Sequence, residues 1–111
     1  MFSKKKISVL VLIVLALLLA ACAPAASPAP EPVSGAQQWL ADELGVPVEE
    51  VEIVSYEEAE WSDSCLGLGG PAESCAAVIT PGWQVILLVD GTEYEVRTDE
   101  AGSQYRLAPP A

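Results

Sequence analysis

The dipeptide Asp90-Gly91 stands between two runs of alternating residues and constrains the fold more than any other feature of the chain. Asp-Gly favours a two-residue type I′ hairpin turn, in which both central residues adopt positive φ angles. A turn of that length fixes the register of the strands that it joins, here 83–89 and 92–98. We therefore predict an antiparallel hairpin whose apolar face meets the rest of the core. The predicted cross-strand pairs are Val89 with Thr92, Leu87 with Tyr94, Val85 with Val96 and Trp83 with Thr98.

The residues before the hairpin carry a helix pattern and then a strand pattern. Ser34 and Gln37 have the spacing of a capping box, and Gly45 suits the position after a helix end. We predict a helix over residues 35–44. We also predict a strand over 51–61, whose imperfect alternation of acidic and apolar residues leaves its inward face open. The predicted core face of the helix comprises Ala36, Trp39, Leu40 and Leu44.

A short last strand, 103–107, follows a turn at 99–102 and completes the pattern. The order α-β-β-β predicts the α+β class, with one N-terminal helix packed on a small antiparallel sheet. The foldable part is a single domain over residues 33–108, followed by a tail at 109–111.

The first 21 residues have the layout of an export signal. Lys4, Lys5 and Lys6 are followed by an apolar run over residues 7–19 and then by small residues. A transmembrane anchor is the alternative, but a helix over that run reaches only ~20 Å against a hydrocarbon core of ~30 Å. We predict a signal peptide over residues 1–21.

The segment Leu19-Ala20-Ala21-Cys22 resembles the lipobox of bacterial lipoproteins. The resemblance implies that Cys22 receives a diacylglyceryl group, becomes the first residue after cleavage, and anchors the protein through acyl chains such as palmitate. Each buried CH₂ contributes ~0.8 kcal/mol, so that two or three chains hold a protein on a membrane. We expect the domain on the extracytoplasmic side of the cell membrane or the outer membrane, with residues 22–32 as a Pro/Ala-rich tether.

The charge balance excludes several classes of function. All sixteen acidic residues follow the signal, but only Arg97 and Arg106 among the basic residues do. Two arginines cannot neutralise several phosphates, which excludes nucleic acid as a partner. The chain after Cys22 also lacks His and Lys, and with them the commonest general base and the Schiff-base amine. We therefore expect no enzymatic activity and no cofactor.

Residues 62–81 form a long Gly-rich stretch that contains Cys65 and Cys75. A loop of that length inside a small domain is usually functional or cross-linked. With Cys22 acylated, the two cysteines form an even pair in an exported chain, which predicts a disulfide. A redox pair is the alternative, but the spacing is not CxxC and no His or Lys is available to lower a thiol pKa.

Three further hypotheses concern catalysis, metal binding and ligand binding. Asp63 and Glu73 could act as the carboxylate pair of an extracellular hydrolase, although Asp63 could equally hydrogen-bond the amides of its own loop. The acidic residues between 49 and 63 could bind Ca²⁺, but no D-x-[DN]-x-[DN]-G loop is present, and we predict no metal site. Aromatic residues could form a ligand platform instead. Such a platform for a ligand or glycan would use Trp61, Trp83 and Tyr105. Our candidate binding surface comprises Trp61, Asp63 and Trp83.

Two family resemblances bear on the domain. Trp61 to Gly67 forms a W-x-D-x-C-L-G motif that, with Thr80-Pro81-Gly82-Trp83 and the stretch 94–102, resembles a small uncharacterised domain of exported bacterial proteins over residues 36–107. More weakly, the order of helix, strand and hairpin is similar to PepSY-type domains, which accompany secreted peptidases and are thought to restrain them. The cysteine loop departs from the PepSY pattern.

Together these features predict a membrane-anchored exported lipoprotein that acts as a non-catalytic binding module at the cell envelope. Its acidic surface favours a basic or neutral protein partner. The alternatives are a PepSY-like restraint of an exported peptidase and the carboxylate-dependent hydrolase. The sequence leaves open the identity of the partner, the membrane and the oligomeric state.

Overall fold

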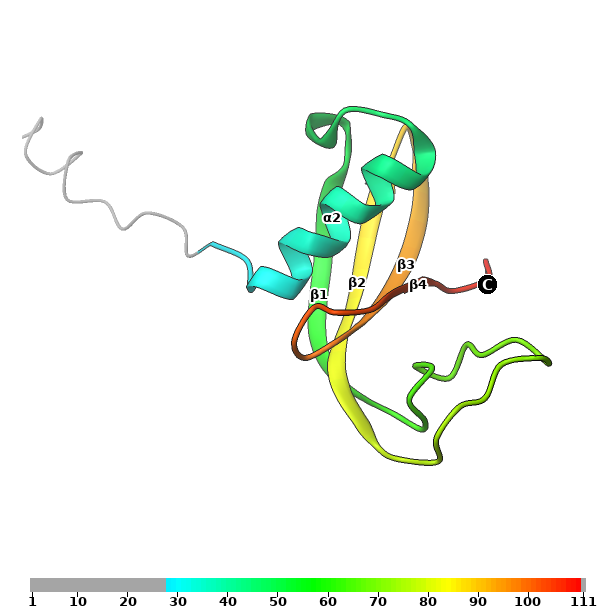
Figure 1. Cartoon of the computed structure of the whole chain (residues 1–111). Coiled ribbons are helices and arrows are strands. Elements are labelled where there is room, and N and C mark those ends of the chain that lie inside the picture. Colours follow the sequence, from blue (N-terminus) through cyan, green and yellow to red (C-terminus); the bar gives the residue numbers. More distant parts are fainter. Residues whose placement is uncertain (1–27, 111) are drawn as a thin grey trace, which may run out of the picture.

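An N-terminal helix lies across one face of a four-stranded antiparallel sheet in the computed structural model, which describes residues 28–110 (Figure 1). The strands follow one another in the order β1-β2-β3-β4, and the predicted α+β class is confirmed. The predicted signal peptide and Cys22 lie outside the described residues. The elements are α2 (Glu31–Leu44), a 3₁₀ turn η1 (Val48–Glu50), β1 (Glu52–Trp61), β2 (Thr80–Val89), β3 (Thr92–Asp99) and β4 (Tyr105–Leu107).

The β2–β3 hairpin has the predicted register. Asp90 and Gly91 adopt φ angles of 48° and 78°, as a type I′ turn requires. Val85 faces Val96, and the other three predicted pairs also form. Local turn chemistry therefore fixes which side chains of the two central strands point toward α2.

The core lies between α2 and the apolar face of the hairpin. Burial alternates along β2, where Val85 and Leu87 are buried and their neighbours are only half-buried. Trp39 of α2 stacks on Tyr105 of β4, with ring centroids 6.1 Å apart. The buried cluster comprises Val33, Ala36, Leu40, Ala41, Val51, Val85, Leu87, Val89 and Val96.

The predicted start of the helix was wrong. Helix α2 begins at Glu31 with Pro30 as its N-cap, and Ser34 lies inside the first turn and makes no cap. Pro32 is tolerated there because the first-turn amides have no partner within a helix. Val33 is fully buried in that turn, and its burial favours the earlier start. The last two residues assigned to the tether are therefore helical, and the inward place predicted for Leu44 is taken by Ala41.

Strand β1 contains an irregularity that the sequence pattern could not place. Ile53 pairs with Leu87, but Ser55 pairs with Ile86, so that Val54 is an extra residue in β1. A bulge of this kind reverses which side chains point inward beyond it. This reversal explains why the acidic and apolar residues of β1 alternate imperfectly.

Strand β2 begins three residues before the predicted start. Its pairing with β1 continues to Trp61 opposite Thr80, so that the first residues of β2 fall within the predicted loop. The loop is correspondingly shorter than predicted. Across residues 28–110, no helix is long and apolar enough to span a bilayer.

Candidate functional site

The loop between β1 and β2 is closed by the predicted disulfide. Cys65 and Cys75 are bonded with their Cα atoms 5.5 Å apart. Ser64 ties the same two arms together, because its Oγ accepts a hydrogen bond from the Ala76 amide at 2.8 Å and its amide donates to the Ala76 carbonyl at 3.0 Å. The segment from Ser64 to Ala76 is therefore closed twice, by the disulfide and by these hydrogen bonds, and we call it the ring.

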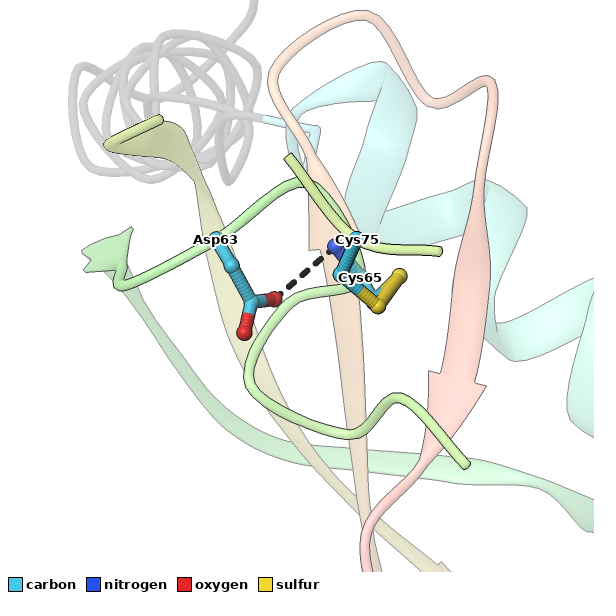
Figure 2. A group of neighbouring side chains, drawn as sticks. All are labelled: Asp63, Cys65 and Cys75. Atoms are coloured by element: carbon cyan, nitrogen blue, oxygen red, sulfur yellow. Dashed lines mark hydrogen bonds between the residues drawn. A yellow bond between two sulfur atoms is a disulfide. The ribbon is translucent and has the colours of Figure 1, made fainter. Parts of the chain in front are cut away.

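Asp63 organises the first turn of this ring. Its Oδ1 accepts hydrogen bonds from the Cys65 amide at 2.9 Å and from the Gly67 amide at 3.0 Å. Figure 2 shows the carboxylate directed at the Cys65 amide, beside the disulfide. Asp63 therefore satisfies backbone donors of its own loop, as short acidic side chains do in turns.

Arg97 and Arg106 hold the ring against the sheet. Arg97 Nη1 donates to the Leu66 carbonyl at 2.8 Å, and its guanidinium lies 4.4 Å from the centre of the Trp61 ring. Arg106 forms a two-pronged ion pair with Glu73, with N–O distances of 2.8 and 2.6 Å. Both arginines lie opposite each other on β3 and β4 and alternate with residues that face α2, so that the ring covers the other face of the sheet.

The ion pair also fixes the charge of Glu73. The hydrogen bond from Arg106, together with one from the Gly70 amide, lowers the pKa of Glu73 from 4.5 to about 2. A general acid must carry its proton near the working pH. Glu73 is unsuited to that task, and Asp63 is engaged with amides.

A metal site in the ring is also disfavoured by its chemistry. One ligand atom from each of Asp63, Cys65 and Cys75 lies within 4.8 Å of the others. Both sulfurs belong to the disulfide, however, so that neither is a thiolate ligand. The remaining ligand is the carboxylate of Asp63, which already accepts hydrogen bonds from two backbone amides.

The two tryptophans of the candidate binding surface do not come together. Trp61 lies on the ring side of the sheet, where its Nε1 donates to the Thr98 carbonyl at 3.1 Å. Trp83 faces Glu58 on the α2 side and packs edge-on against Tyr56 at 5.9 Å. Tyr105 packs with Trp39 instead, so no shared aromatic platform forms among these residues.

The acidic strand β1 is the feature that no contact among residues 28–110 explains. It is an edge strand, and its carboxylates lie outside the ion pairs that the described residues form. Neither β1 nor its neighbour β2 carries a basic residue. Four side chains of β1 are both acidic and exposed: Glu52, Glu57, Glu58 and Glu60.

A surface pocket of about 260 Å³ lies beside this strand, between β1, the start of β2 and the β3–β4 turn. The sequence pattern pointed to Trp83 and, separately, to the acidic residues between 49 and 63, but not to Glu100, which reaches the pocket only through the fold. The hydrogen bond from the Glu100 amide to the Pro81 carbonyl, at 2.9 Å, brings that turn to β2. The lining residues are Glu58, Ala59, Glu60, Pro81, Gly82, Trp83 and Glu100.

Residues 33–107 match the model of a family described as Domain of unknown function (DUF8738). The match spans most of the described structure and confirms the expectation of an uncharacterised domain family. No curated protein and no solved structure matches the chain.

Substitution of Asp63 separates a structural from a chemical role. We expect Asp63→Ala to lower the free energy of unfolding by about 1–2 kcal/mol, because the Cys65 and Gly67 amides lose their acceptor. Asp63→Asn keeps an oxygen at the same position and should cost less than half as much. Urea unfolding of the three proteins measures this, and equal losses for both variants would contradict the assignment.

The Arg106–Glu73 pair should make stability depend on pH. The pKa of Glu73 in the folded state lies below its ordinary value, so the stabilisation is complete above about pH 5 and is lost as the pH falls toward 2. The difference in melting temperature between wild type and Glu73→Gln should therefore shrink over that interval. Glu93→Gln, which removes an exposed carboxylate of β3, is the matched control and should show no such trend.

Proposed function

Because this chain belongs to the DUF8738 family, whose function is unknown, we propose its role from its own residues: a lipid-anchored, exported protein-binding module without catalytic activity. The segment Leu19 to Cys22 supports the anchor, since small residues before a cysteine fit the lipobox of bacterial lipoproteins. The apolar run before it supports export. The domain then lies outside the cytoplasm, on the cell membrane or the outer membrane.

The observation that carries the binding role is the exposed surface along β1. Its carboxylates form no ion pair with the residues that the structure describes, and Val54 and Tyr56 are 48% and 42% exposed on the same strand. Val78 and Ile79, which lead into β2 where it pairs with the end of β1, are more exposed still at 58% and 63%. Exposed apolar side chains that are rimmed by polar or charged residues are typical of a protein-binding surface.

The contacts that Asp63 and Glu73 make within the ring and with Arg106 support a non-catalytic role. The carboxylates of the alternative hydrolase, Asp63 and Glu73, hold the ring in place through amides and through Arg106. A PepSY-like restraint of an exported peptidase would also use an exposed surface. The identity of a partner bound at β1 distinguishes that alternative from a general accessory role.

Acylation of Cys22 tests the anchor. With a clickable fatty acid added to growing cells, the wild-type chain should become labelled, and Cys22→Ala should not. The double variant Cys65→Ala, Cys75→Ala is the matched control, because it removes two other sulfurs and should stay labelled. Label on the Cys22→Ala chain would contradict the lipoprotein assignment.

Site-specific cross-linking tests the binding surface. We would replace Tyr56 of the full chain with the photo-reactive residue benzoylphenylalanine and irradiate cell-envelope preparations that contain this variant. Mass spectrometry would then identify the cross-linked proteins. Leu107 at the opposite edge, with a similar exposure of 43%, is the control position. We expect one exported protein at position 56 and not at 107. A peptidase would favour the restraint, and equal products at both positions would overturn the proposal.

A further inference from the structure

We infer that β1 receives an extended cationic segment of a partner protein as an added strand of the sheet. This inference rests on the proposed protein-binding function and names its mode. In such strand addition the main chain supplies hydrogen bonds, and alternate side chains supply specificity.

The two edges of the sheet are built differently. Strand β4 has three residues and is followed by Pro109 and Pro110, which lack an amide hydrogen and cannot extend the pairing. Strand β1 has ten residues, lacks proline, and has no strand of residues 28–110 beyond it (Figure 1). After the bulge at Val54, the pairing of β1 with β2 is regular through Trp61. The outer edge of β1 therefore has no strand partner among residues 28–110.

The charge of β1 selects the added strand. A second copy of β1 would place Glu57, Glu58 and Glu60 near like charges, which is unfavourable across a strand pair. A segment rich in lysine or arginine would instead place opposite charges beside them. The two arginines of residues 28–110 contact the ring, so no basic side chain in that part of the chain pairs with these carboxylates.

The pocket beside β1 offers a place for one cationic side chain of that segment. Glu58 and Glu60 lie on its strand wall, Glu100 lies on the facing turn, and Trp83 forms the aromatic wall. Gly82 lets β2 approach β3 closely behind this wall, because a Cβ there would strike the Thr98 carbonyl of β3. Carboxylates together with an aromatic face bind lysine and arginine side chains, by charge and by cation–π attraction.

A synthetic peptide of alternating lysine and threonine is the probe, titrated into the full chain in a non-ionic detergent by calorimetry. The comparison peptide has the same sequence with every backbone amide methylated, which keeps the charge and removes the donors. We expect the methylated peptide to bind at least about tenfold more weakly. Amides of residues 57–60 should exchange hydrogen more slowly only with the unmodified peptide.

Paired substitutions test the charge. Glu58→Gln with Glu60→Gln should weaken binding of the unmodified peptide about fivefold. Glu43→Gln with Glu49→Gln removes the same charge from exposed positions outside the sheet and should leave the affinity nearly unchanged. Equal effects of the two pairs would overturn the role of the pocket.

The outcomes separate this inference from the proposed function. Equal affinity for both peptides, or no binding of either, overturns strand addition. A single partner cross-linked through position 56 would then still support the protein-binding role. Loss of that cross-link, with strand addition of the peptide intact, would instead remove the proposed function and leave only an edge that can accept a strand.

Discussion

The attachment of the cysteine ring to the sheet by two guanidinium groups is the interaction on which the surface of this protein depends. Arg106 binds both oxygens of Glu73, and Arg97 binds the Leu66 carbonyl while lying over Trp61. Planar guanidinium groups suit such two-pronged contacts better than an ammonium group does. Arg97 and Arg106 are the only basic residues of 28–110, and both lie on the face of the sheet that the ring covers. The negative charge of β1 therefore has no neighbouring positive charge in this part of the chain.

That imbalance gives the edge of the sheet its specificity. Natural proteins protect edge strands with charge, with short strands or with proline. The β4 edge is protected by a short strand and by the prolines that follow it, whereas β1 is protected by charge. Charge of a single sign repels another copy of the chain but attracts a cationic partner, so that the same residues prevent self-association and favour a particular class of partner.

Sequence predicted those parts of the fold that depend on neighbouring residues. The hairpin register follows from Asp90-Gly91, and the disulfide joins the two cysteines that remain once Cys22 is assigned to the predicted lipobox. The helix start depends on the burial of Val33 against the sheet, and the inward face of β1 depends on the bulge at Val54. Neither leaves a local signal. The pocket was missed for the same reason, because Glu100 and Trp83 are brought together only by the pairing of β2 with β3.

The ring also determines the geometry of the binding surface. A free segment of this length would make the pairing of β1 with the start of β2 entropically costly, whereas a disulfide closing about eleven residues contributes roughly 3 kcal/mol in the chain-entropy estimate. With the ring closed and bound to Arg97 and Arg106, β2 can begin at Thr80 and pair with Trp61. This early start places Gly82 and Trp83 beside the carboxylates of β1. The disulfide therefore supports the pocket by positioning β2, without contributing an atom to its walls.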